Sequence, residues 1–171
     1  IMGSKWTVQD VKKVLMEAGE VMGLSPADVP VQVSSRMERT MGSFLFKEKA
    51  GVITPFAFRF SEVLLSGKFE DRVVRDVILH EYAHFYCNVT SQKNHNHDDY
   101  FKSICIKLGA PPHTYFKELL PVQKKKGYVL VCRKCGKVVA KRRRIDAVEK
   151  IVSTKISTCC RAKLGSYKSV F

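Results

Sequence analysis

The sequence lacks an apolar run long enough to cross a bilayer, which takes about 20 consecutive apolar residues. The first ten residues, IMGSKWTVQD, also lack the basic and then apolar pattern of a secretory signal peptide. These two absences predict a protein with no membrane partner, located in the cytoplasm or at the nucleoid, or in the nucleus of a eukaryotic cell. We expect it to be a monomer.

Acidic residues are scarce in the last third of the chain. The 171 residues include 30 Lys and Arg against 16 Asp and Glu, a net charge of +14. Residues 1–120 hold 15 basic and 14 acidic residues, whereas residues 121–171 hold 15 basic and only 2 acidic residues. We therefore expect a nearly neutral domain, 1–120, joined to a basic segment, 121–171. Such a local positive field is typical of polyanion binding; a solvated surface or an acidic protein partner is the alternative.

A second C-x-x-C motif is also missing, although the basic segment holds four of the six cysteines. Cys132-Arg-Lys-Cys135-Gly is typical of a turn in which two thiolates reach one ion. Cys159 and Cys160 would complete a structural zinc site. Because these two are adjacent, the alternative is that one is idle and a histidine or water completes the site. Cys87 and Cys105 lie in apolar helical patterns and are expected in the core.

The composition, with 45% hydrophobic and 27% charged residues, excludes a disordered tail protein and a fibre. Apolar periodicity predicts the fold class α+β, with helices on a small antiparallel sheet and a zinc-ribbon-like β segment at the carboxy terminus. The expected helices are 7–22, 70–87 and 98–108, and the expected strands are 31–33, 42–46 and 56–60. In the basic segment we expect a linker at 121–126 and strands at 128–131 and 137–140.

The helix expected at 70–87 contains the motif H-E-x-x-H. His80 and His84 lie one turn apart on the same helix face and can hold one ion between them. Zinc accepts neutral imidazole, and it activates a bound water as the nucleophile. Glu81 would then act as the general base. The surrounding residues are almost wholly apolar, so the histidines need a buried partner, which a metal supplies.

A catalytic zinc site needs a third ligand, and the two common extensions of the motif fail at Thr90. The remaining candidates are His95, His97, Asp98 and Asp99. His97 is four residues before Phe101, which places it on the core-facing stripe of the next helix, so we favour His97.

Lysines and arginines surround the cysteines and can neutralise phosphates, while nearby aromatic rings can stack on unpaired bases. No helix with a groove-reading signature is present, so we expect DNA binding of low sequence specificity. The run 141–144 is alternatively a solvated turn or a nuclear import signal. The candidate contacts are Lys124, Lys125, Lys126, Arg133, Lys134, Lys141, Arg142, Arg143 and Arg144.

Four stretches of the sequence resemble the SprT-like zinc metalloprotease family, whose eukaryotic members include Spartan. They are SRMERTMG at 35–42, VILHEYAH at 77–84, HDDYF at 97–101 before Gly109, and the cysteine-containing stretch 132–164. The resemblance implies a zincin-like core with a zinc ribbon. It also implies a zinc endopeptidase of DNA repair, active on proteins bound or crosslinked to DNA.

Two other classes of protein stay open. One is a nucleic-acid-binding zinc protein whose H-E-x-x-H site is not catalytic, although a purely structural site would not require Glu81. The other is a different metal-dependent hydrolase, such as a nuclease.

Overall fold

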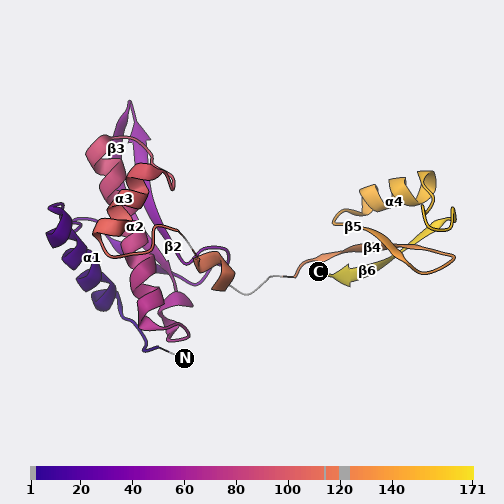
Figure 1. The fold of residues 1–171 in the computed structure, drawn as a ribbon, viewed down its shortest axis with the longest axis horizontal. Helices are drawn as coiled ribbons and strands as arrows, with labels where there is room; N and C mark the ends of the chain where they lie inside the picture. The colour runs from indigo at the N-terminus through magenta and orange to yellow at the C-terminus, as the bar shows by residue number, and fades with distance from the viewer. Residues whose placement is uncertain (1–2, 114, 120–123) are drawn as a thin grey trace. The chain divides into compact units, whose positions relative to one another are not determined.

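A computed structural model describes residues 3–113, 115–119 and 124–171. The chain forms two compact units, which we call unit 1 (residues 1–120) and unit 2 (residues 121–171) (Figure 1). Unit 1 contains α1 (Val8–Met22), β1 (Val31–Ser34), β2 (Gly42–Lys49), β3 (Val52–Ser61), η1 (Leu64–Ser66), α2 (Asp71–Ser91), α3 (Asp99–Lys107) and η2 (Phe116–Leu119). Unit 2 contains β4 (Lys126–Cys132), β5 (Val138–Arg142), α4 (Ile145–Thr154) and β6 (Leu164–Val170). The fold class, α+β, is confirmed.

The sheet of unit 1 has the strand order β1-β3-β2 and is mixed rather than wholly antiparallel, which corrects the expected arrangement. β2 pairs antiparallel with β3, but β1 pairs parallel with β3, with Val31 opposite Phe58. The reason is the path of the chain. Residues 35–41 form a connection past β3 to the far edge, and the tight turn at Ala50 and Gly51 then reverses the chain, so β3 runs in the direction of β1.

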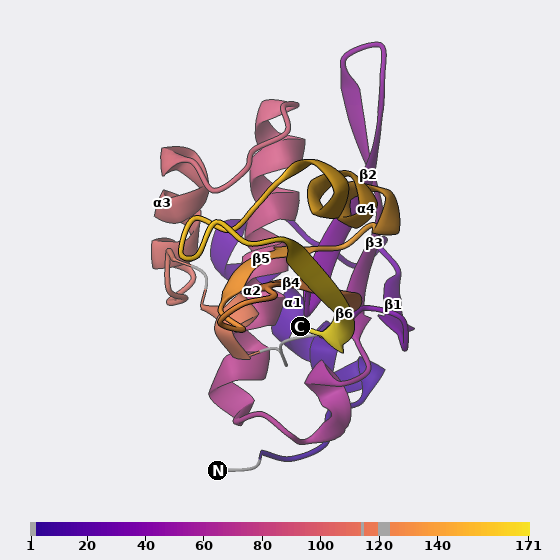
Figure 2. The same cartoon turned by 90° about the vertical axis from the view of Figure 1, so that its right-hand side faces the viewer.

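The helices lie on one face of this sheet, and the β2–β3 hairpin projects beyond them (Figure 2). α1 begins at a capping box in which Thr7 and Asp10 exchange hydrogen bonds, and it ends at Gly23 in the left-handed region. α2 continues one turn past the expected end, to Ser91, and Gln92 caps it in the left-handed region. The side-chain amide of Gln92 accepts from Ile53 N–H and donates to Ile53 C=O, which ties the helix end to β3. No helix of the described residues is long and apolar enough to cross a membrane.

The core of unit 1 surrounds α2, which packs against α1, α3, β2 and β3. The rings of Phe44, Phe58 and Phe85 meet at centroid distances of 5.4 to 5.7 Å. Each buried aromatic side chain stabilises the fold by about 1.5–3 kcal/mol. Cys87 and Cys105 are buried in this core, as expected. A helix enclosed on several sides in this way holds its polar side chains in fixed positions.

Unit 2 is a three-stranded antiparallel sheet of order β5-β4-β6, with α4 inserted between β5 and β6. Neither α4 nor β6 was expected from the sequence. Residues 121–123 of the expected linker lie outside the described residues. Lys125 already exchanges two main-chain hydrogen bonds with Phe171, and Lys126 begins β4. Between residues 124 and 171, the part of unit 2 that the structure describes, the buried hydrophobic residues are few: Val129, Leu130, Cys132, Val148 and Leu164.

Candidate metal centres

Three histidines bring one ring nitrogen each to a common point in unit 1. α2 carries His80 and His84, and His97 comes from the loop between α2 and α3. The Nε2 atom of His80 lies 3.2 Å from that of His84 and 3.1 Å from that of His97. Nitrogens placed tetrahedrally at 2.0–2.1 Å from zinc would be roughly 3.3 Å apart. The three side chains therefore form a candidate zinc-binding group.

The chemistry of this donor set also fits zinc. Burial and the neighbouring histidines lower the pKa of His80 to about 3, and burial above all lowers that of His84 to about 4. Both rings are neutral at neutral pH, so their lone pairs are available to a metal without loss of a proton. Among the described residues the group holds three histidines and no fourth protein ligand, which is the composition of a catalytic rather than a structural site.

The aromatic ring of Phe101 packs against the rings of all three histidines. Its ring stacks on His84 at a centroid distance of 4.3 Å and lies 4.8 Å from His80 and 5.0 Å from His97. Phe101 is fully buried in the first turn of α3. His97 itself comes directly before Asp98, the N-cap of α3, so it belongs to the loop and not to the helical stripe on which it was expected.

Glu81, the residue after His80 on α2, is buried, with an exposed fraction of 4%. Gly42, the first residue of β2, lies against it: a Cβ atom at Gly42 would be 3.1 Å from Cγ of Glu81. Burial raises the pKa of Glu81 to about 8. A carboxyl group whose pKa is near neutrality can both accept and return a proton at physiological pH.

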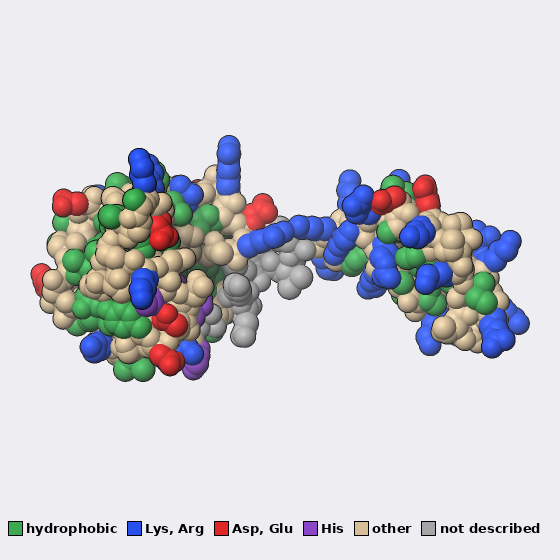
Figure 3. All heavy atoms as spheres, turned by 90° about the horizontal axis from the view of Figure 1, so that it is seen from above, with side chains coloured by type: hydrophobic (Ala, Val, Ile, Leu, Met, Phe, Trp, Pro, Cys, Tyr) green, Lys and Arg blue, Asp and Glu red, His purple; other side chains and the backbone are tan. Residues whose placement is uncertain are grey.

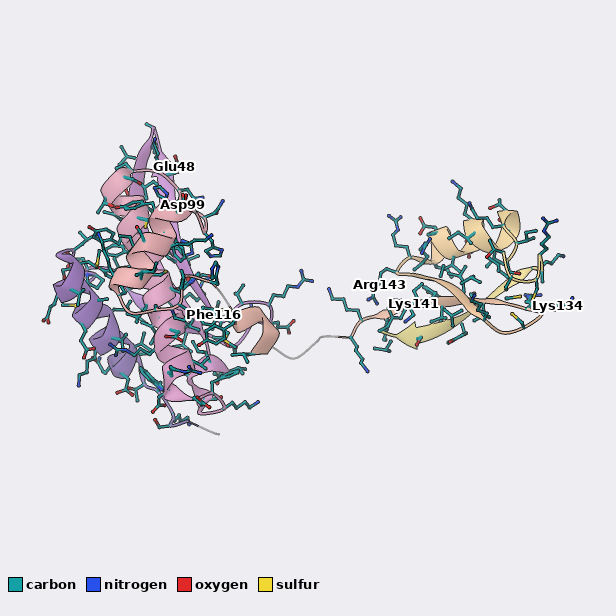
Figure 4. The ribbon with its side chains drawn as sticks, in the orientation of Figure 1. Glu48, Asp99, Phe116, Lys134, Lys141 and Arg143 are labelled. Atoms are coloured by element: carbon teal, nitrogen blue, oxygen red, sulfur yellow. The ribbon has the colours of Figure 1, made fainter. Side chains whose placement is uncertain are left out.

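The segment after α3 packs against the other side of the site. Phe116 in η2, labelled in Figure 4, places its ring 5.6 Å from that of His80. The preceding residue, Tyr115, donates a 2.6 Å hydrogen bond to Asp76, a buried residue one turn before His80. Tyr115 thus anchors to α2 the segment that carries Phe116.

The other three candidates for the third ligand, His95, Asp98 and Asp99, form hydrogen bonds elsewhere or are exposed. The ring of His95 is hydrogen-bonded to Ser91 Oγ at 2.7 Å and to Asp98 Oδ2 at 2.6 Å. Asp98 also caps α3 through the N–H of Phe101, as expected for an acidic residue at a helix start. Asp99 is exposed at the first position of α3. The structure groups only His97 with His80 and His84.

Substitution of His95 and His97 in turn should show which of these two loop histidines is the third zinc ligand. His97→Ala leaves two ligands and is expected to weaken zinc binding at the histidines by more than about 100-fold. His95→Ala keeps all three ligands, and we expect it to weaken binding by about 10-fold at most. Chelator competition followed by NMR signals of the histidine rings measures both. A greater loss in His95→Ala than in His97→Ala would assign the third ligand to His95.

Unit 2 brings its four cysteines together in a second candidate zinc-binding group. Cys132 ends β4, Cys135 lies in the following turn, and Cys159 and Cys160 lie in the turn before β6; their sulfur atoms are all within 4.8 Å of one another. Gly136, with φ of 76°, closes the first turn by donating its N–H to Cys132 C=O. All six cysteines lie in the described part of the chain, and none forms a disulfide. The cluster is consistent with a zinc-ribbon-like segment.

The thiols of this cluster titrate unequally. The Ser157 hydroxyl, helped by main-chain groups of the turn, lowers the pKa of Cys132 to about 6. Hydrogen bonding with Cys135 and crowding by the other sulfurs raise the pKa of Cys160 to about 12. Four thiolates cannot share this volume without a cation, and a divalent metal would remove that conflict.

The basic residues named above are all exposed in unit 2, where blue Lys and Arg side chains gather on the face shown in Figure 3. Figure 4 shows Lys134 at the cysteine end of the small sheet and Lys141 and Arg143 at the other end. Four of the expected contacts already interact within the unit. Lys141 lies 5.1 Å over the Phe171 ring, and Arg142 donates to the Lys141 carbonyl. Arg143 donates to the carbonyls of Lys125 and Phe171 and lies 4.0 Å over the Phe171 ring. Arg144 forms a two-bond pair with Asp146.

Two residues near the histidines were not expected from the sequence. Phe116 follows an irregular Pro-rich stretch, where no periodicity indicates its position. Asn88 is 1% exposed on α2, four residues after His84. A lone amide in line with two histidines in an apolar helix is a signal that could have identified Asn88, because buried polar groups need partners.

A helix that carries two of three convergent histidines, on a mixed α+β core, forms a candidate metal-binding site built on an H-E-x-x-H motif. The sequence profile of the SprT-like family matches residues 12–121, which cover nearly all of unit 1 and more than half of the chain. The chain belongs to the SprT-like family, and this membership suggests a metalloprotease-like function. No curated protein gave a significant match to the chain.

Proposed function

We propose that the protein is a zinc endopeptidase that cleaves proteins associated with or crosslinked to DNA. The observation that carries the proposal is the convergence of three histidines: Nε2 of His80 lies 3.2 Å from that of His84 and 3.1 Å from that of His97, and the residue that follows His80 on α2 is the buried Glu81. Membership of the SprT-like family supports the peptidase chemistry. The basic surface of unit 2 supports the location of the substrates.

His80, His84 and His97 would hold the zinc through Nε2. Zinc in such a site supplies Lewis-acid chemistry, since it lowers the pKa of bound water to about 7 and polarises carbonyl groups. Glu81 takes up a proton on its carboxylate and returns it to the leaving amine. Phe101 and Phe116 pack apolar rings against His80, and this burial keeps the His80 ring neutral.

Unit 2 would bind the phosphate backbone of DNA. Exposed Lys and Arg side chains release counterions when they neutralise phosphates, and this binding does not depend on sequence. A tethered peptidase would then meet DNA-bound proteins at a raised local concentration.

The direct test is cleavage of a protein crosslinked to an oligonucleotide, compared with the same protein free of DNA. We expect the zinc-loaded chain to cut the polypeptide, a chelator to stop it, and added zinc to restore it. The DNA strand should stay intact, which excludes a nuclease. A chain that holds zinc at the three histidines but leaves the polypeptide whole, with every form of DNA supplied, would instead be a non-catalytic nucleic-acid-binding protein.

DNA affinity should fall steeply with salt and depend on unit 2. The double variant Lys141→Glu with Arg142→Glu reverses two exposed charges and should weaken DNA binding by at least about 10-fold at low salt, with a shallower salt dependence. Fluorescence anisotropy with a labelled oligonucleotide measures both. The matched control, Lys47→Glu with Lys49→Glu, reverses two charges on β2 in unit 1 and should leave binding nearly unchanged. Equal losses in the two double variants would remove the DNA-binding role from unit 2.

A further inference from the structure

The ring of His84 makes one contact on each of its two nitrogens. Nε2 faces the other histidines, and Nδ1 lies 3.1 Å from the main-chain carbonyl oxygen of His95. A carbonyl oxygen only accepts hydrogen bonds, so Nδ1 must carry the proton in this contact. The neutral ring then presents a lone pair on Nε2, the atom that faces His80.

The peptide that supplies this carbonyl is held by a side chain of α2. The N–H of His95 donates a 2.7 Å hydrogen bond to Oδ1 of Asn88. Asn88 is 1% exposed and lies one helical turn after His84. Because α2 is fixed by packing on several sides, this hydrogen bond fixes the position of the His95 peptide relative to His84.

The same peptide lies two residues before His97, so its position also governs the third histidine. The His95 ring is held at both ends, by Ser91 from α2 and by Asp98 at the start of α3. His97 follows within this anchored loop, and its Nε2 lies 3.1 Å from that of His80. The buried amide of Asn88 therefore helps to position both His84 and His97.

We propose that Asn88 is a positioning residue of the trihistidine centre: it fixes the tautomer of His84 and the placement of His97, and so sets the affinity for zinc. The effect on affinity rests on the proposed role of the three histidines as zinc ligands. The effect on the tautomer does not, since it concerns the chain's own hydrogen bonds. Groups that orient metal-binding histidines typically change metal affinity by about 10- to 100-fold when they are removed.

The test compares two variants of the full-length chain at one position. Asn88→Leu has a similar shape and no acceptor. Asn88→Asp keeps the oxygen that accepts from His95 and loses the 3.4 Å contact of the amide with Asn94; burial favours the neutral form of the carboxyl group that it introduces. Ring-nitrogen NMR signals report each of the five histidines, so they follow zinc at the trihistidine centre separately from zinc at the cysteines. Val14→Ala, a core truncation on α1, serves as a control for lost stability.

In the metal-free wild-type chain we expect His84 as the Nδ1-protonated tautomer, and in Asn88→Leu a mixture of tautomers. Zinc affinity at the histidines should fall by about 10- to 100-fold in Asn88→Leu and stay close to wild type in Asn88→Asp and Val14→Ala. An unchanged tautomer in Asn88→Leu, or an equal loss of affinity in Val14→Ala, would overturn the proposal.

A wild-type chain that takes up no zinc at its histidines would refute the proposed function, yet the tautomer comparison would still decide the role of Asn88. If Asn88→Leu does not fold, hydrogen exchange in the wild type decides instead. The amide of His95 should be strongly protected by its bond to Asn88, and rapid exchange of that amide would overturn the proposal.

Discussion

Glu81→Gln is expected to lower peptide cleavage by about 10²- to 10⁴-fold while zinc remains bound at the three histidines. Glutamine keeps the size and the polarity of the side chain but cannot accept and return a proton. The three Nε2 atoms that would bind zinc do not involve Glu81, so the metal site should persist. Cleavage of a DNA-crosslinked protein and zinc content per chain measure the two effects.

The variant should also be at least as stable as the wild type without metal, so loss of activity cannot come from unfolding. Burial raises the pKa of Glu81 from its ordinary value of 4.5 to about 8. The folded chain therefore binds the proton more tightly than the unfolded chain, and metal-free wild type loses stability as the pH rises from about 4.5 to 8. Glu81→Gln removes that loss.

Glu48→Gln is the matched control, because it makes the same chemical change on an exposed residue of β2 (Figure 4). It should leave cleavage within about twofold, as surface substitutions usually have small effects. Full activity in Glu81→Gln would show that another group moves the proton.

Removal of metal is expected to unfold unit 2 and leave unit 1 folded. Unit 1 holds a continuous core that includes many large buried side chains, whereas the buried hydrophobic residues of unit 2 are few. A small unit with so little core depends on metal binding, which supplies about 10–16 kcal/mol in structural zinc sites. Amide NMR spectra with and without chelator should lose the dispersed signals of residues 124–171 alone.

Single cysteine substitutions provide the control and address the choice left open by the sequence. Cys135→Ser should unfold unit 2 even with zinc present, while Cys87→Ala, in the core of unit 1, should leave unit 2 folded. Because the structure groups both adjacent sulfurs with Cys132 and Cys135, Cys159→Ser and Cys160→Ser should each destabilise unit 2. A unit 2 that stays folded in chelator would contradict a structural role for the metal.

The helical part of the site could be predicted from the sequence because its geometry is local. The spacing of His80 and His84 places them on one face of any helix. His97 was predicted as well, from its place four residues before Phe101, but it lies in the loop before the N-cap Asp98, where a helical period does not fix the direction of a side chain. The grouping of the three nitrogens is a fact of tertiary structure, and so is the Asn88–His95 contact that depends on the course of the loop.

Two elements of unit 2 were not predicted, for different reasons. β6 is mostly exposed and shows no clear apolar period. In α4, Ile145, Val148, Ile151 and Val152 do follow a helical period, and the prediction missed this signal. The direction of β1 depends on a connection that passes β3, which local pattern does not encode. Arg143 is expected to contact DNA because of its charge, and charge alone did not predict that its guanidinium also holds the start of β4 to Phe171.

A crystal structure of the zinc-loaded chain, with anomalous scattering recorded at the zinc edge, tests the central claim most directly. We predict one zinc peak about 2.0–2.1 Å from Nε2 of His80, His84 and His97. We also predict a second peak among the four sulfurs of unit 2. A first peak bound by His95 or Asp98 in place of His97, or no peak at the histidines, would contradict the account.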